Sequence, residues 1–206
     1  MPSPELAEAD GLLAIGGDLS SDRLLMAYKM GIFPWYNEGE EILWWSPDPR
    51  FVLYPNELYV SKSMKKLIDK AIFKVTIDKN FEQVIRNCKG ISRSGQEGTW
   101  ITDEMEQSYI KLYEKGIAHS VEVWDDNELV GGLYGIRLGN IFFGESMFSK
   151  KSNASKFGFI HWVRTLQQEG VKIIDCQIPT DHLSSLGARE IPRKAFLHLL
   201  RKNLDK

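Results

Sequence analysis

Two polar side chains share one predicted strand. Asp175 and Gln177 lie in the run IIDCQ at 173–177, which reads as a buried strand. Because side chains alternate along a strand, both would point to one face, while Ile174 and Cys176 point to the other. Two buried polar groups on one wall need hydrogen-bond partners. An isolated pair of this kind is more often a structural pair that covers a helix end than a catalytic one.

Glu145 is a third candidate, because it is the charged residue of the otherwise apolar run FFGESMF at 142–148. A carboxylate is much less costly to bury when it is paired, so we expect Glu145 to meet a cation. The alternative is a solvated strand residue with no function.

Composition restricts the class of protein. With 206 residues, 43% of them hydrophobic, the chain has an ordinary globular composition and room for one large core and a smaller lobe. A formal net charge of -2 argues against an indiscriminate nucleic-acid binder, since nonspecific binding needs many Lys and Arg residues. Cys88 and Cys176 lie too far apart to suggest a zinc site or a disulfide framework, so we expect no metal.

The location expected from the sequence is the cytoplasm, with no membrane contact. No apolar run approaches the roughly 20 residues that span a bilayer. Residues 1–10 are too acidic and too rich in proline for a signal peptide.

Elements that could position these side chains alternate along the chain. Proline at 34, 47 and 49 makes 33–50 mostly irregular and places a lobe boundary near Arg50. We expect strands at 51–54, 73–77, 119–124, 128–137, 140–148 and 171–178. We expect helices at 22–29, after Ser61, at 81–88, 102–115 and 153–169, and from Pro192 onward. The order predicts an α/β (α+β) fold, with a small N-terminal lobe at 1–50 and a larger domain at 51–206.

A series of longer motifs runs through nearly the whole chain. They read GLLAIGGDLS at 11–20, GIFPWY at 31–36, LWWSPDPR at 43–50, GTWIT at 98–102, GGLYG at 131–135, FFGESMFS at 142–149, NASK at 153–156, IIDCQ at 173–177, SLGA at 185–188 and EIPR at 190–193. In this order they resemble the leucyl/phenylalanyl-tRNA-protein transferase family. Because these long, tryptophan-rich motifs occur together and in the same order, the resemblance is highly specific.

The resemblance implies an aminoacyltransferase that moves Leu or Phe, and by shape also Met, from aminoacyl-tRNA to the N-terminal α-amine of a protein. The family's acceptors begin with Arg or Lys, and the transferred residue marks them for N-end-rule degradation. No ATP or other cofactor is expected, because the ester is already activated. The implied fold is a GNAT-like acyltransferase domain with a mixed, mostly antiparallel sheet flanked by helices, and a monomer is the default expectation.

By the same resemblance Glu145, Asp175 and Gln177 are the polar residues of the catalytic centre. Glu145 would hold the α-ammonium of the esterified amino acid. The carbonyl of Gln177 would hydrogen-bond the attacking amine, and Asp175 would orient that amine and favour transient positive charge on its nitrogen.

The pocket for the donor side chain is carried over from the family. It would be formed by Leu133, Phe142, Met147, Phe159, Trp162 and Ile174, each of which would otherwise be read as plain core. A pliable methionine suits Leu, Phe and Met, whereas Ile and Val would clash through their branched Cβ. Strict alternation puts Phe142 on the face opposite to Glu145 and Met147, so either the strand bulges near Gly144 or one placement is wrong.

Aromatic and basic residues are the implied contacts with tRNA. Trp35 and Trp100 match positions that hold the terminal adenosine, and Tyr28 and Tyr109 match nearby positions. Lys62, Lys65 and Lys66 could meet phosphates of the acceptor stem, although such a run is usually a solvated helix face.

Other function classes stay open at this point. An acyl-CoA-dependent N-acetyltransferase would share the fold, but SKKSNASKFG at 149–158 lacks the R-x-x-G-x-G pattern that cradles pyrophosphate. A non-catalytic tRNA-binding module would use the aromatic residues without chemistry. A thiol enzyme could use Cys176 with His161 or His182, but buried strand cysteines are usually inert.

Overall fold

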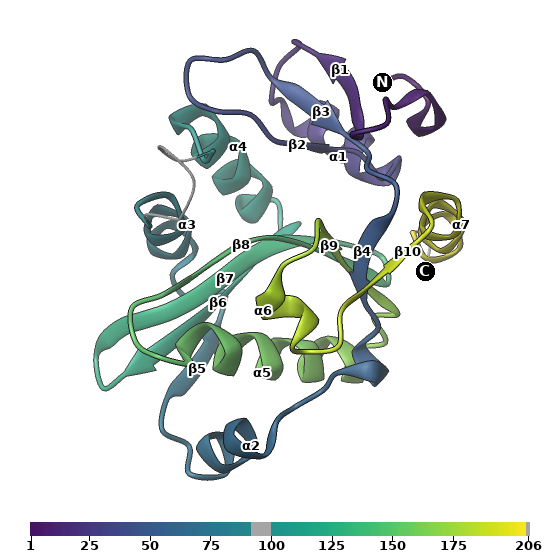
Figure 1. The fold of residues 1–206 in the computed structure, drawn as a ribbon. Coiled ribbons are helices and arrows are strands. Elements are labelled where there is room, and N and C mark those ends of the chain that lie inside the picture. Colours follow the sequence, from purple (N-terminus) through teal and green to yellow (C-terminus); the bar gives the residue numbers. More distant parts are fainter. Residues whose placement is uncertain (92–99, 205–206) are drawn as a thin grey trace.

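A seven-stranded mixed sheet forms the centre of the protein, in a computed structural model that describes residues 1–91 and 100–204. Its strands run in the order β10-β4-β9-β8-β7-β6-β5 (Figure 1). Their bounds are β4 (Arg50–Leu53), β5 (Lys74–Ile77), β6 (Ala118–Asp125), β7 (Glu128–Leu138), β8 (Ile141–Ser149), β9 (Ile173–Gln177) and β10 (Arg189–Ile191). Strands β8 and β9 pair in parallel, and the other neighbours pair antiparallel. The expected mixed, mostly antiparallel sheet is confirmed.

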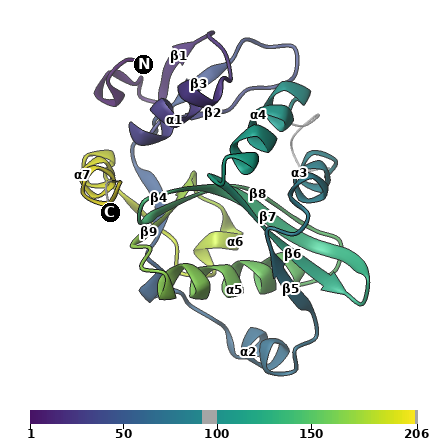
Figure 2. The ribbon, with the colours of Figure 1, turned by 180° about the vertical axis from the view of Figure 1, so that it is seen from behind.

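Helices cover both faces of this sheet (Figures 1 and 2). Helix α5 (Ala154–Gln168) packs on one face, and α3 (Phe81–Lys89) and α4 (Asp103–Glu114) lie on the other. The further helices are α1 (Ser21–Lys29), α2 (Lys62–Asp69), α6 (Asp181–Ser184) and α7 (Arg193–Asn203), with short 3-10 turns at Pro4–Leu6 and Pro55–Glu57. None of the helices in the described ranges is long and apolar enough to span a membrane.

The small N-terminal lobe consists of α1 and a three-stranded sheet in the order β1-β3-β2. Its strands are β1 (Leu12–Ile15), β2 (Phe33–Pro34) and β3 (Leu43–Trp45). Apart from β2 and β3, the chain between Phe33 and Arg50 is irregular, as its prolines predicted. Strand β1 was not predicted. Leu24 and Trp44 of the lobe belong to the same buried cluster as Val52 and Phe143 of the large sheet. The lobe therefore shares its core with the rest of the chain.

A bulge in β8 decides which side chains face the site. Tyr134 of β7 lies opposite Ser146, yet the next residue, Gly135, lies opposite Gly144, so Glu145 is the extra residue. A side chain on Gly135 would collide with the carbonyl oxygen of Phe143, so only glycine fits there. Of the two alternatives left open by the sequence, the structure selects the bulge near Gly144.

The bulge also determines on which face of the sheet each apolar side chain of β8 lies. Phe142 and Met147 lie in the core cluster beneath α5, whereas Phe143 and Phe148 lie in the cluster on the opposite face. Without the extra residue, Phe142 and Met147 would point to opposite faces of the sheet. Glu145 can therefore point away from both.

The parallel pairing of β8 and β9 is short. It joins Ile141 to Ile173, Phe142 to Ile174 and Phe143 to Asp175, and it extends no further. Beyond this point β8 continues to Ser149, while β9 ends at Gln177, whose φ of 65° is unusual for a residue other than glycine. The sheet is thus open between the ends of these two strands.

Candidate active site

A pocket of about 460 Å³ opens where β8 and β9 stop pairing. Such a volume is typical of a site for a small molecule or a cofactor-sized group. Its walls come from both faces of the sheet, because residues of both buried clusters line it. Its polar groups include Glu145 and Gln177, one from each of the separating strands.

Most of the residues expected to hold the donor side chain do line this pocket. They are Leu133, Phe142, Met147, Phe159 and Ile174. The expectation for Trp162 has to be corrected, because this residue does not line the pocket. Its ring packs edge-on against Phe142, with centroids 5.4 Å apart, and so supports the wall from behind.

Glu145 is held by hydrogen-bond donors. Tyr28 Oη donates to Glu145 Oε1 at 2.7 Å, and Tyr109 Oη donates to Oε2 at 2.8 Å. Gln177 Nε2 also donates to Oε1, at 3.1 Å. Within the described protein the partners of Glu145 are thus neutral donors, and the α-ammonium expected beside it stays a prediction.

The electrostatic state of this group follows from its surroundings. Burial raises the pKa of Glu145 to about 7, although the hydrogen bonds from Tyr28, Tyr109 and Gln177 oppose the shift. Burial also raises the pKa of both tyrosine hydroxyls well above their usual value, so they stay protonated and able to donate. Glu145 can therefore change charge near neutral pH while its donors cannot.

Tyr28 and Tyr109 have a different environment from the one the sequence suggested. Both are fully buried, and their hydroxyls contact each other as well as Glu145. A ring with no exposed face cannot stack on a base in this structure. Their expected contact with adenosine is thus replaced by direct support of the carboxylate.

Trp35 and Trp100 both line the pocket, from two distant segments of the chain. Trp35 follows β2, and Trp100 precedes α4. Gly98 and Thr99 of the motif that contains Trp100 lie outside the described residues. The two tryptophans therefore form part of the same cavity as Glu145 and Gln177.

Gln177 is oriented at both its side chain and its backbone. Gln177 Nε2 donates to Glu145 in this structure, and an ionised Glu145, which can only accept, favours this orientation, in which the carbonyl end of the amide does not face Glu145. The backbone N–H of Gln177 donates to Asp175 Oδ1 at 3.0 Å, which holds the left-handed conformation of Gln177. Asp175 and Gln177 therefore interact through the backbone.

Asp175 forms an ion pair with Arg50 instead of contacting the pocket. Arg50 Nε and Nη2 donate to the two carboxylate oxygens at 2.8 and 2.6 Å, and the two side chains are 1% and 0% exposed. The guanidinium lies between the rings of Phe33 and Phe196, 4.7 Å from each centroid. The sequence led us to expect a direct contact between Asp175 and an attacking amine. The structure corrects this expectation, because Asp175 is fully buried and does not line the pocket.

Sequence reasoning gave no role to Arg50 or to α6, which adds His182 and Leu183 to the pocket wall. A signal for Arg50 was available, since a basic residue that opens an apolar strand needs a buried opposite charge. Helix α6 is too short to leave a periodic pattern.

The basic residues assigned to phosphate lie away from the pocket. Lys62, Lys65 and Lys66 are exposed on α2, which lies on the side of α5 remote from the sheet (Figures 1 and 2). None of them lines the pocket. A phosphate contact at α2 stays a prediction.

Cys176 lines the pocket, so whether it could act as a nucleophile depends on the protonation state of its thiol. Burial raises the pKa of its thiol, which keeps the sulfur protonated at neutral pH. A protonated thiol is a poor nucleophile, and this argues against a thiol enzyme.

Comparison with known proteins decides the family. Residues 52–201 match the family described as leucyl/phenylalanyl-tRNA protein transferase, and residues 17–48 match the N-terminal domain of that transferase. The chain belongs to this family. It is an aminoacyltransferase that uses aminoacyl-tRNA as donor and a protein as acceptor.

Individual relatives agree over nearly their whole length. The chain is 60% identical over 200 residues to the leucyl/phenylalanyl-tRNA–protein transferase of Flavobacterium johnsoniae, covering 96% of this chain and 94% of that one. It is 58% identical over 201 residues to the enzyme of the same name from Christiangramia forsetii, covering 97% and 95%.

Solved structures with a related fold are more distant. The structure of L-PGS from Bacillus licheniformis has a TM-score of 0.44 at 10% identity, covering 78% of this chain and 51% of that chain. A GCN5-related N-acetyltransferase from Kribbella flavida has a TM-score of 0.42 at 8% identity, covering 79% and 58%. At these scores the likeness carries no functional conclusion.

Removing Arg50 tests the buried ion pair. In Arg50→Met the Asp175 carboxylate is left buried without its cation, and the free energy of unfolding should fall by about 3 to 5 kcal/mol. Arg189→Met is the matched control, because Arg189 pairs with Glu57 and stacks on Tyr54 while half exposed. It should cost less than about 1 kcal/mol. Urea denaturation measures both, and equal small losses would contradict the assignment.

The pKa of Glu145 predicts a pH dependence of stability. Its folded value of about 7 lies above the ordinary 4.5, so the folded state binds an extra proton between these values. The wild type therefore loses stability as pH rises from about 4.5 through 7, by up to roughly 3 kcal/mol. Glu145→Gln lacks this proton, so its stability relative to the wild type should increase over the same range. Denaturation curves at several pH values test this, and a constant difference would contradict it.

Proposed function

We propose that this transferase moves Leu or Phe, and by shape also Met, to the N-terminal α-amine of proteins that begin with Arg or Lys. The modified proteins would be marked for N-end-rule degradation, and the enzyme would act as a monomer in the cytoplasm. The observation that supports the proposal is the pocket itself, in which apolar walls meet a carboxylate and a carboxamide.

The apolar part of the pocket suits a side chain that is not branched at Cβ. Leu133, Phe142 and Phe159 give it rigid walls, and Met147 gives it one adaptable side. Leu, Phe and Met all carry their bulk beyond Cβ, away from the ester. Ile and Val carry a branch next to the ester, so they should be rejected by shape.

Glu145 suits the α-ammonium of the esterified amino acid. Its pKa of about 7 leaves it partly protonated when the site is empty. A cation close to the carboxylate favours the charged form and lowers that pKa, so donor binding would deprotonate Glu145. Tyr28 and Tyr109 keep the carboxylate in place before and after this change.

The reaction needs little more than orientation. The acceptor nitrogen attacks the ester carbonyl carbon, a C–N bond forms, and the C–O bond to the 3′ oxygen of the adenosine breaks. One proton leaves the nitrogen and ends on the departing oxygen. Because an α-amine has a pKa of about 7.7 to 8.0, a useful fraction is already neutral at pH 7.

Gln177 is the residue that we assign to the attacking amine. Its carbonyl oxygen can accept an N–H of that amine and stabilise positive charge developing on the nitrogen. While Glu145 is ionised, the hydrogen bond that Nε2 donates to it favours this orientation of the amide. Asp175 and Arg50 are positioning residues, since they act on Gln177 through its backbone N–H.

Trp35 and Trp100 suit the terminal adenosine of the tRNA. An aromatic face stacked on a base contributes roughly 1 to 3 kcal/mol, without regard to sequence. Lys62, Lys65 and Lys66 remain candidates for a phosphate farther along the acceptor stem, because they are exposed and basic.

A transfer assay tests the proposed function. The protein is incubated with leucyl-tRNA, phenylalanyl-tRNA or isoleucyl-tRNA and a peptide that begins with Arg, and the peptide is weighed by mass spectrometry. We expect a gain of one Leu or Phe residue and none of Ile. Acetyl-CoA as donor should give no product. Binding of charged tRNA without any product would favour a binding module instead.

A substitution tests the assignment of Gln177. In Gln177→Ala the carbonyl acceptor is lost, and kcat should fall by about 100-fold or more, as when one transition-state hydrogen bond is removed elsewhere. Donor affinity should stay near the wild-type value, since Trp35, Trp100 and the apolar walls are unchanged. Gln168→Ala, at an exposed position of α5, is the control. Wild-type turnover in Gln177→Ala would refute the role.

A further inference from the structure

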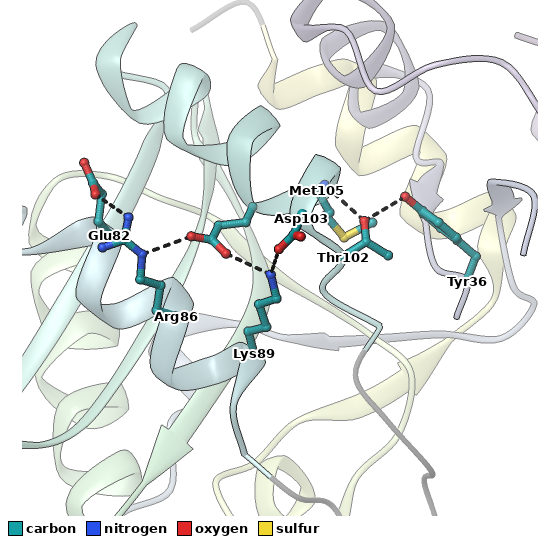
Figure 3. Close-up of polar contacts among 8 residues, drawn as sticks. Tyr36, Glu82, Arg86, Lys89, Thr102, Asp103 and Met105 are labelled. Carbon is teal, nitrogen blue, oxygen red and sulfur yellow. Dashed lines mark hydrogen bonds and ion pairs between the residues drawn. The ribbon is translucent and has the colours of Figure 1, made fainter. Parts of the chain in front are cut away.

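One hydrogen bond joins the two chain segments that carry the pocket tryptophans. Tyr36 directly follows Trp35, and Thr102 lies two residues after Trp100. The hydroxyl groups of Tyr36 and Thr102 lie 3.2 Å apart (Figure 3). The residues are 6% and 9% exposed, so water competes little for this bond. The spacing between the two tryptophans is thus linked to a single buried contact.

Thr102 is in turn fixed to the start of α4. Its Oγ1 accepts the backbone N–H of Met105 at 3.2 Å, which makes Thr102 the N-cap of that helix (Figure 3). Any movement of the first turn of α4 would therefore move Thr102 and, through the intervening Ile101, the backbone of Trp100.

Ion pairs tie this first turn to the end of α3. Lys89 Nζ lies 3.0 Å from Glu106 Oε2 and also contacts Asp103, while Arg86 Nε lies 3.1 Å from Glu106 Oε1. Glu106 is 7% exposed, so these contacts are partly protected from solvent. The Lys89–Glu106 pair is partly buried and should contribute most, whereas Asp103 and Arg86 are exposed and their contacts are weaker.

Helix α3 is itself anchored to the sheet. Phe81, Val84, Ile85 and Cys88 are buried in the cluster that also holds Tyr134 and Phe148 of the pocket wall. A continuous series of contacts therefore runs from the sheet through α3 and the ion pairs to Trp100, and from Thr102 through Tyr36 to Trp35. Ile91, just after α3, lines the same pocket.

We propose that Lys89 and Tyr36 are positioning residues of the donor site, which hold Trp35 and Trp100 at the separation that a planar base requires. The inference rests on the proposed function, in that the planar group is the terminal adenosine of aminoacyl-tRNA. Lys89 acts through Glu106 and Asp103 and not on the tRNA, because both carboxylates already contact its ammonium group.

Kinetics with two donors test the proposal. The donors are phenylalanyl-tRNA and phenylalanine esterified to adenosine alone, which has no tRNA phosphates. In Lys89→Met and in Tyr36→Phe, KM for both donors should rise roughly five-fold or more, the minimum expected for loss of one stacked contact. The kcat should stay within about two-fold of the wild type, since Glu145 and Gln177 keep their partners. Lys89→Arg should restore KM.

Controls separate the possible outcomes. Lys111→Met removes an exposed charge from α4, the helix whose first turn Lys89 contacts, and should leave KM unchanged for the adenosine ester. A rise in KM for phenylalanyl-tRNA alone would mean that Lys89 meets a phosphate and would overturn the proposal. A fall in kcat at unchanged KM would show a merely structural role and would also overturn it. No transfer by the wild type from either donor would instead refute the proposed function.

Discussion

The buried ion pair between Arg50 and Asp175 is the interaction on which the rest of the site depends. Arg50 opens β4, and Asp175 lies in the neighbouring strand β9. The guanidinium is sandwiched by Phe33 of the N-terminal lobe and Phe196 of the C-terminal helix. One cation thus joins the small lobe, the central sheet and α7. Burying two charges is costly, and the bidentate pairing and the two flanking rings offset part of that cost, while Arg50 Nη1 is buried without a hydrogen-bond partner among the described residues.

The consequence of this pair reaches the pocket through one hydrogen bond. Asp175 Oδ1 holds the backbone N–H of Gln177, whose left-handed conformation would otherwise be unfavourable. The amide of Gln177 then meets Glu145 across the gap between the separating strands, and Tyr28 and Tyr109 fix the far side of that carboxylate. The polar groups are therefore oriented in the absence of a ligand, which on the proposed function would lower the cost of reorganisation during the reaction.

The sequence could predict what depends on local patterns. Alternation placed Asp175 and Gln177 apart from Ile174 and Cys176, and the conflict between Phe142 and Met147 indicated a bulge that the structure contains. Contacts between distant segments left no such pattern. The partnership of Arg50 with Asp175 joins residues 125 positions apart, and that of Tyr28 with Glu145 joins residues 117 apart. Trp162 was carried over from the family, and in this structure it lies one turn of α5 beyond Phe159, where its ring packs against Phe142 and does not line the pocket.

The small lobe contributes residues to the pocket at the gap between β8 and β9. A sheet with an open position would normally expose backbone groups and apolar edges to water. Here Trp35 of the lobe and Trp100 line the pocket at that gap, and the core of the lobe is continuous with that of the large sheet. The lobe therefore completes the cavity as well as covering it. On the proposed function, an ester bound between the two tryptophans and Gln177 would touch both parts of the chain at once, so we expect transfer to need the lobe as well as residues 51–206.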